Sequence, residues 1–250
     1  DVVARLRAAR VRFLVGGAFA LKEYAGICRN TKDLDLVIKP QSFPAVERAL
    51  VAAGYDVELT FTHWLGKVRH DHHFVDVMFN SGNGLTAIDD EWFEHARPAK
   101  LFGHDVELVP PEELLFSKCF VMERERFDGA DVAHLLRSCA TTMDWPRLLA
   151  RFGDRWRVLL SHLVMFGFIY PGERHNVPPW VVERLSLAML DEVEPTSQID
   201  MRCQGTLVSR AQYIVDVQHW GYEDARLGTS GGGMTEQQIH AWTEAINKIV

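Results

Sequence analysis

The chain has 250 residues, of which 47% are hydrophobic and 24% charged, which is the composition of an ordinary soluble globular protein. Its formal net charge is −7, so no global positive field favours a long nucleic-acid partner, although a local basic groove remains permitted. A chain of this length can bury one sizeable core or two small ones, and we expect two subdomains.

The cysteine pattern and the apolar stretches predict a cytoplasmic protein that makes no use of a membrane. The most apolar stretch, residues 156–170, contains Arg157 and is shorter than the roughly 20 residues of a spanning helix. No charged-then-apolar leader precedes the first predicted helix. The cysteines are scattered without a CxxC pair, which is typical of reduced, packing cysteines. They are Cys28, Cys119, Cys139 and Cys203.

The first half of the chain alternates helical and β-type patterns. Helices are expected at 2–9, 18–25 and 43–53. β-type runs are expected at 11–15, 34–38, 57–61, 64–69, 74–79 and 106–109. These patterns predict an α+β fold, a mixed β-sheet with helices mainly on one face, occupying residues 1–110.

From Pro110-Pro111 onward the pattern is helical, which predicts an all-α C-terminal subdomain over 111–250. Helix starts or apolar helices are expected at 144–146, 159–168 and 179–190. Residues 221–234 are expected to form a flexible segment, because 228–233 are rich in Gly, Ser and Thr. A final helix follows, with Thr235 and Gln238 in a capping box and an apolar face of Ile239, Trp242, Ile246 and Ile249.

Two aspartates in the β-type run Asp33-Leu34-Asp35-Leu36 carry the first chemical signal. Side chains alternate along a strand, so both carboxylates point to one face and the leucines to the other. Unpaired like charges this close are unfavourable unless a cation lies between them. Mg²⁺ takes oxygen ligands and keeps phosphate oxygens among them, so the pair suits a nucleotide-phosphate site.

A third carboxylate, Asp76, interrupts the apolar strand Phe74-Val75-Asp76-Val77. An aspartate in such a strand is costly unless it is paired or liganded. If this strand lies beside the one that carries Asp33 and Asp35, three carboxylates can bracket two metal ions, and Asp76 can also accept the proton of an attacking hydroxyl. Before these strands, Gly16-Gly17 ends a strand and opens a helix, where backbone amides can approach a triphosphate.

This order of elements resembles the DNA polymerase β-like nucleotidyltransferase superfamily. The shared features are a strand followed by Gly-Gly and a helix, then Asp-x-Asp on a strand, then a single Asp on a later strand; the Arg-x-Thr-x-Asp-Leu-Asp version is similar to the minimal bacterial members. The match covers about residues 11–79, with an extension through 110–118. The family includes antibiotic nucleotidyltransferases and toxin-type enzymes that modify transfer RNA or proteins.

The resemblance implies a role for each matching residue. Gly16 and Gly17 would contact the nucleotide phosphates, and Asp33, Asp35 and Asp76 would be the catalytic residues that hold two Mg²⁺ ions. Lys118 would help to neutralise the triphosphate. Arg29 and Thr31 would contact phosphate or order the turn before the strand.

The implied activity is transfer of a nucleoside monophosphate from an NTP to a hydroxyl, with release of pyrophosphate. The acceptor is a small molecule, a transfer RNA end or a protein hydroxyl; the negative net charge favours a small or cationic acceptor. Two other functions stay open: a non-catalytic nucleotide- or partner-binding module, and a metal-dependent phosphohydrolase that uses His70-Asp71-His72-His73.

The same residues also have plainer explanations. Asp33 and Asp35 could lie on a solvated edge strand, balanced by Lys32 and Lys39. Asp76 could be a buried acid paired with Arg69, and Gly16-Gly17 could be only a tight turn. Lys118 could extend its ammonium to solvent, as lysines in apolar helices do.

Overall fold

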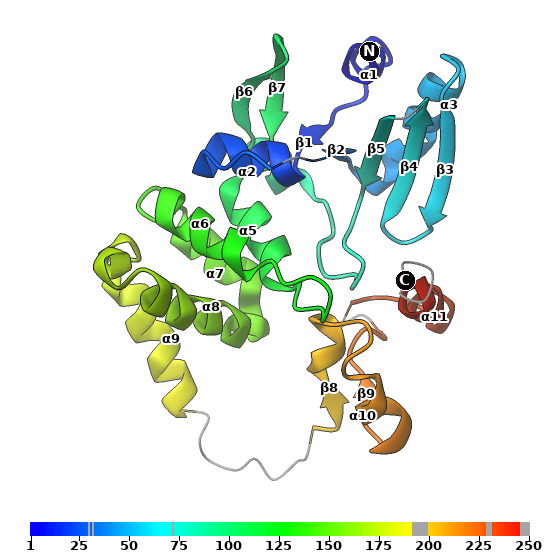
Figure 1. Ribbon diagram of the computed structural model, residues 1–250. Coiled ribbons are helices and arrows are strands. Elements are labelled where there is room, and N and C mark those ends of the chain that lie inside the picture. The colour runs from blue at the N-terminus through cyan, green and yellow to red at the C-terminus, as the bar shows by residue number, and fades with distance from the viewer. Residues whose placement is uncertain (30, 32, 72, 192–199, 229–231, 246–250) are drawn as a thin grey trace. The chain divides into compact units, whose positions relative to one another are not determined.

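The computed structural model describes the whole chain except residues 30, 32, 72, 192–199, 229–231 and 246–250 (Figure 1). The described residues form two compact units. The first consists of 1–110 together with the described part of 225–250, and the second of 111–224. None of the helices within these ranges is long and apolar enough to span a bilayer.

The first unit is built on a seven-stranded mixed sheet in the order β3-β4-β5-β2-β1-β7-β6. The strands are β1 (Leu14–Val15), β2 (Asp33–Val37), β3 (Asp56–Phe61), β4 (Leu65–His70), β5 (His73–Met78), β6 (Arg97–Leu101) and β7 (His104–Leu108). The β2–β5 and β1–β7 pairs are parallel and the other neighbouring pairs are antiparallel. Strand β2, which carries the first two aspartates, therefore lies inside the sheet and not at its edge.

The helices of this unit are α1 (Val2–Ala8), α2 (Gly17–Ala25), α3 (Phe43–Val51), α4 (Asp90–Glu94) and α11 (Glu236–Glu244), with a 3-10 turn at Pro40–Ser42. Leu6 of α1 and Leu50 of α3 join Leu36 of β2 and Val77 of β5 in one core, and all four side chains are fully buried. A fully buried aliphatic side chain contributes about 1.5–3 kcal/mol. The face of the sheet that carries Leu36 and Val77 is thus covered by the hydrophobic core.

The C-terminal helix α11 packs on the first unit, near the β3–β4 end of the sheet (Figure 1). The ring of Trp242 lies 5.1 Å from that of Phe61 and 5.0 Å from that of Trp64, both edge to face. The capping box of Thr235 and Gln238 is confirmed. The sequence predicted that this helix belongs to the C-terminal helical subdomain. It packs on the first unit instead, because the Trp242 indole joins an aromatic cluster of the sheet. Ile246 and Ile249 lie outside the described residues.

Some described residues of the segment 221–234 are buried, among them Ala225 and Met234, while Leu227 is 40% exposed; the flexibility expected from the composition stays a prediction. Arg226 is fully buried and donates to the Thr243 hydroxyl at 3.2 Å. Gly232 lies so close to Asn83 that a Cβ there would be 2.2 Å from the Asn83 carbonyl oxygen. Close backbone approach thus explains this glycine; residues 229–231 lie outside the described part.

The second unit is helical. Its helices are α5 (Pro111–Cys119), α6 (Gly129–Cys139), α7 (Trp145–Phe152), α8 (Trp156–Ile169), α9 (Pro179–Asp191) and α10 (Ile214–His219), with 3-10 turns at Gly153–Arg155, Pro171–Asn176 and Gln204–Leu207. The helix start at Asp144 is confirmed, since its side chain accepts from the Arg147 backbone at 3.1 Å. The helical C-terminal part expected from the sequence is confirmed, and it also contains one short parallel pair of strands, β8 (Arg202–Cys203) and β9 (Glu223–Asp224). Two-residue strands leave no periodic pattern in a sequence.

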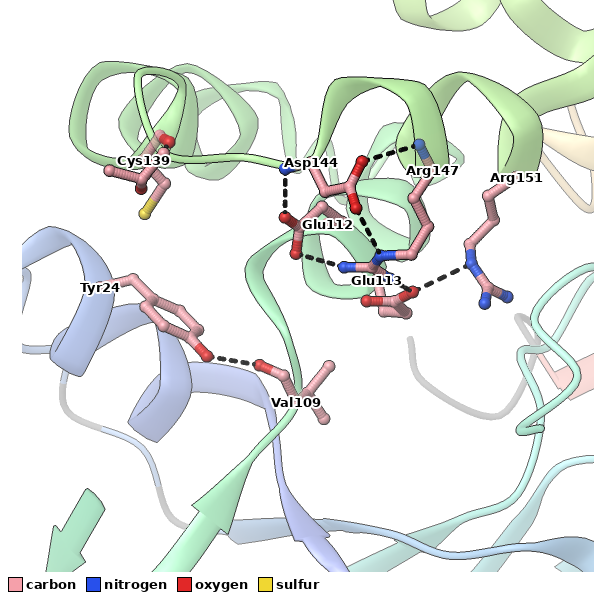
Figure 2. A network of polar contacts seen from close by, with 9 residues as sticks. Tyr24, Val109, Glu112, Glu113, Cys139, Asp144, Arg147 and Arg151 are labelled. Atoms are coloured by element: carbon pink, nitrogen blue, oxygen red, sulfur yellow. Dashed lines mark hydrogen bonds and ion pairs between the residues drawn. The ribbon is translucent and has the colours of Figure 1, made fainter. Parts of the chain in front are cut away.

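A buried ion cluster joins α5 to α7 within the second unit (Figure 2). The Arg147 guanidinium forms ion pairs with Glu112, at 2.8 Å, and with Glu113, while Arg151 Nε lies 3.1 Å from the same Glu113 oxygen. Glu112 also accepts from the Asp144 backbone N–H at 2.7 Å. Both glutamates lie in the first turn of α5, where the helix dipole favours negative charge. The cluster therefore fixes the start of α5 against α7.

The α+β fold class expected from the sequence is confirmed, with two differences in the sheet. Strand β1 is restricted to Leu14–Val15, although the β-type pattern began at residue 11. Strand β6 and helix α4 were not expected. Pro98 lies within β6, and a proline weakens a strand prediction, although the edge position of β6 tolerates it.

Candidate active site

The three aspartates lie on two neighbouring strands and share one face of the sheet. In the parallel β2–β5 pair, Asp35 is directly opposite Asp76, and Asp33 is opposite Phe74. Directly opposed residues project to the same side, and alternation places Asp33 on that side as well. Leu36 and Val77 point to the packed side. The carboxylates therefore occupy the face opposite the core.

Gly16 and Gly17 lie directly against Asp35. The Gly16 N–H donates to the Asp35 backbone carbonyl at 2.9 Å. Gly17 has φ +53°, and a Cβ added there would be 1.6 Å from Asp35 Oδ2. Only glycine avoids this overlap, and only glycine adopts such a φ at little cost. Gly17 thus holds the start of α2 beside a carboxylate, which goes beyond the tight turn considered from the sequence.

Thr31 contacts an aspartate side chain directly. Its hydroxyl lies 2.5 Å from Asp33 Oδ1 and 3.3 Å from the Asp33 carbonyl oxygen. The hydroxyl can donate its proton to the carboxylate, which fixes the rotamer of Asp33. Arg29 is exposed in the segment before β2. Of the two residues that the sequence placed at the phosphates, Thr31 is positioned to orient Asp33.

Asp76 is partly buried and faces a lysine that the sequence analysis did not include. Its side chain is 17% exposed, and its Oδ1 lies 3.5 Å from the Lys67 ammonium. Burial raises the pKa of Asp76; the Lys67 charge opposes the rise and the Asp33 charge adds to it. Arg69, the partner considered from the sequence, is instead 2.8 Å from Glu58. The ion pair of Asp76 is therefore with Lys67.

The edge-strand explanation of Asp33 and Asp35 does not agree with the structure. Strand β2 has β5 on one side and β1 on the other. Lys39 forms its ion pair with Asp90. Lys32 lies outside the described residues. Solvent exposure at a sheet edge therefore does not account for the two aspartates of β2.

Lys118 belongs to the second unit, where its ammonium is buried between two carboxylates. Its Nζ lies 3.0 Å from Asp128 Oδ2 and 2.6 Å from Asp131 Oδ2, and the lysine is 8% exposed. Two carboxylates already compensate the one positive charge. This arrangement holds α5 to the start of α6, and it replaces the solvent-directed lysine considered from the sequence.

The histidine run lies at the tip of the β4–β5 hairpin. His70 and His73 form the terminal pair of the ladder, and Asp71 has φ +53° in the turn between them. The His70 ring lies 4.7 Å from the ring of Tyr55. His72 is outside the described residues. The His70 ring thus packs on Tyr55, and its Nδ1 lies 3.4 Å from Asp71 Oδ2.

The donor set of the aspartates fits a hard divalent cation better than a transition metal, because it consists of carboxylate oxygens. Asp76 Oδ1 is buried, and within the described ranges it has no hydrogen-bond partner. Such an atom is expensive to bury unless something binds it. In the described part of the chain, no three His, Cys, Asp or Glu side chains are already gathered at metal-binding distances. Metal binding would therefore require the carboxylates to move closer together.

Lys67 could have been found from the sequence through the hairpin register. If the hairpin loop is two residues long, residue 70 pairs with 73, and counting back pairs residue 67 with 76; the structure has both pairs. Glu112, Glu113 and Arg147 gave no such signal, because their meeting depends on how two helices pack.

A family model described as an uncharacterised nucleotidyltransferase matches residues 4–162. The match includes every aspartate and glycine of the site described above. A search of curated protein sequences found no significant match.

Several solved structures are similar to the chain at low identity. ANT(2'')-Ia in complex with adenylyl-2''-tobramycin is 14% identical, with 62% of this chain and 94% of that chain covered and a TM-score of 0.45. The lincosamide antibiotic adenylyltransferase LnuA, bound to lincomycin, is 14% identical, with 54% and 91% covered and a TM-score of 0.39. JHP933 from Helicobacter pylori is 13% identical, with 76% and 94% covered and a TM-score of 0.37.

Proposed function

Because the chain belongs to the nucleotidyltransferase family matched over residues 4–162, we propose that it transfers a nucleoside monophosphate from an NTP to an acceptor hydroxyl. Pyrophosphate is the second product, and Mg²⁺ is the cofactor. The observation that carries this proposal is the β2–β5 register, which sets Asp35 opposite Asp76 on one sheet face and places Asp33 on that face too. The glycine turn lies against the same carboxylates.

The metal ions would be held by Asp33, Asp35 and Asp76. We expect two ions, because three carboxylates can bracket two metal ions between them. When bound, the ions neutralise the charge that develops on the phosphate oxygens during transfer. Thr31 holds the Asp33 carboxylate in one rotamer through its hydroxyl. Gly16 and Gly17 supply backbone amides at the start of α2, where the helix dipole favours phosphate.

In this proposal Asp76 takes the proton of the attacking hydroxyl. Burial raises the pKa of this carboxyl, which brings it closer to that of an effective general base at neutral pH. In the transfer, the acceptor O–H bond breaks and its proton goes to Asp76. The acceptor oxygen bonds to the α-phosphorus, and the bond from that phosphorus to the bridging oxygen breaks to release pyrophosphate.

The acceptor belongs to one of three classes: a small molecule, a transfer RNA end or a protein hydroxyl. The formal charge of −7 favours a small or cationic acceptor over a long polyanion. Lys118 is not assigned a nucleotide role in this proposal, because Asp128 and Asp131 already compensate its charge.

The position of the label in the NTP tests the reaction class. The full chain is incubated with Mg²⁺, a cell extract and each NTP in turn, labelled at either the α- or the γ-phosphate. Nucleotidyl transfer attaches the α-label to an acceptor and releases the γ-label as pyrophosphate. The size of the labelled species then identifies the acceptor class.

Other outcomes contradict the proposal in distinguishable ways. γ-Label released as orthophosphate, with activity lost in His70→Ala and His73→Ala variants, indicates a phosphohydrolase. NTP binding without any transfer across extracts from several sources indicates a non-catalytic nucleotide-binding module.

A further inference from the structure

Lys67 is the cation of a row of charged side chains that crosses the sheet. The row runs from Glu58 on β3 through Lys67 on β4 and Asp76 on β5 to Asp35 on β2, each residue directly opposite the next. Directly opposed residues share a face, so Lys67 projects to the same side as the carboxylates. It is one-third exposed, and its ammonium lies 3.5 Å from Asp76 Oδ1.

The other carboxylate next to Lys67 forms its ion pair with a different cation. Glu58, on its other side, forms an ion pair with Arg69 at 2.8 Å. Arg69 lies two residues along the same strand and also faces Asp56 at 3.7 Å. The positive charge next to Asp76 is thus that of Lys67, while Arg69 forms ion pairs with Asp56 and Glu58.

A 3.5 Å separation is an ion pair without a close hydrogen bond. Lysine carries a compact charge on a flexible stem, so it can approach or leave a carboxylate without moving the strand. A divalent ion bound to Asp76 Oδ1 would occupy the space next to this ammonium, and the two like charges would repel each other. The lysine and the metal therefore compete for the same oxygen.

We propose that Lys67 is a counter-ion that holds Asp76 when metal is absent and makes divalent-metal binding depend on bound NTP. This inference rests on the proposed function. Without nucleotide, metal binding must displace the ammonium from Asp76. With nucleotide, the negative triphosphate offsets the repulsion between the ammonium and the metal. Lys67 is in this sense a positioning residue that keeps the site closed to metal until the substrate arrives.

Mn²⁺ titration followed by electron paramagnetic resonance tests the proposal without requiring turnover. The full-length wild type is compared with Lys67→Met, which keeps the length of the stem and removes the charge. We expect the variant to bind Mn²⁺ about tenfold more tightly without nucleotide, the lower end of the effect of residues that contact metal ligands. With a non-hydrolysable NTP analogue present, the difference between the two proteins shrinks.

Three further variants make the result specific. Lys67→Arg keeps the charge and should bind Mn²⁺ as weakly as the wild type without nucleotide. Lys100→Met removes an exposed lysine of β6, 3.9 Å from Asp105, and should leave Mn²⁺ affinity unchanged. Lys67→Gln is a second neutral variant that replaces Lys67→Met if the latter loses its native circular dichroism.

The outcomes separate this inference from the proposed function. Equal Mn²⁺ affinity of wild type and both neutral variants without nucleotide overturns the role of Lys67 while leaving the metal site intact. A wild type that binds no Mn²⁺ even with the NTP analogue overturns the proposed metal site, and with it the inference.

Discussion

Replacing Gly17 by alanine places a methyl group on the Asp35 carboxylate. The added Cβ would lie 1.6 Å from Oδ2, whereas real Cβ contacts stay beyond about 3 Å, so the carboxylate must move by more than an ångström. The left-handed φ of +53° adds about 1–2 kcal/mol of backbone strain. Gly26→Ala is the matched control: its φ is +70°, and a Cβ there meets no atom within 4 Å.

Urea unfolding and α-label transfer separate the two effects. Both variants should lose about 1–2 kcal/mol of unfolding free energy from the backbone term. Gly17→Ala alone should lose about a hundredfold in transfer rate, because a misplacement of 1 Å at a catalytic group has an effect of that size. Equal transfer rates in the two variants would refute the contact between Gly17 and Asp35 as the reason for this glycine.

Three further substitutions test individual contacts. Asp76→Asn should raise the free energy of unfolding at pH 7, because burial raises the pKa of this carboxyl and folding therefore opposes its ionisation. This gain in stability should disappear below the ordinary pKa of aspartate, where the carboxyl is protonated in both states. A gain that grew toward low pH would contradict this reasoning. Trp242→Ala should lower the free energy of unfolding in urea by about 2–3 kcal/mol, because it removes two aromatic pairs. Trp220→Ala is the control, since Trp220 is 63% exposed, and it should leave the free energy of unfolding unchanged. Equal losses in the two variants would argue against docking of α11. Lys118→Met should cost about 3 kcal/mol in the same measurement, because it removes the buried cation that Asp128 and Asp131 share, although Asp128 keeps its ion pair with Arg126. A neutral result would leave the lysine without this structural role.

The sequence predicted the features of the site that depend on local periodicity. Alternation along Asp33-Leu34-Asp35-Leu36 determines which side chains share a face, and the structure has Leu36 in the core. The same reasoning recognised Asp76 as a costly charge in an apolar strand. The argument required β5 to lie next to β2 but could not establish it from the sequence. The two strands do pair, in parallel.

The features that sequence reasoning missed depend on strand register and on contacts between distant segments. Periodicity shows that Asp76 needs a partner but does not name it, and the choice of Lys67 over Arg69 follows from the register of β4 against β5. The packing of Trp242 on the sheet joins residues that are about 180 positions apart in the chain. Glu112 and Arg147 meet because α5 packs on α7. The hairpin register could have identified Lys67, but local patterns cannot specify the partners of Trp242 and Arg147.

The central claim is that the carboxylates of β2 and β5 support nucleotidyl transfer. The most direct measurement is Mg²⁺-dependent transfer of α-label by the wild type, by the double variant Asp33→Asn, Asp35→Asn, and by Asp56→Asn. Asp56 is a matched control because it lies in the same sheet and pairs with Arg69 away from the site. We predict transfer by the wild type and by Asp56→Asn at similar rates, and none by the double variant. Transfer by the double variant at the wild-type rate would contradict the account.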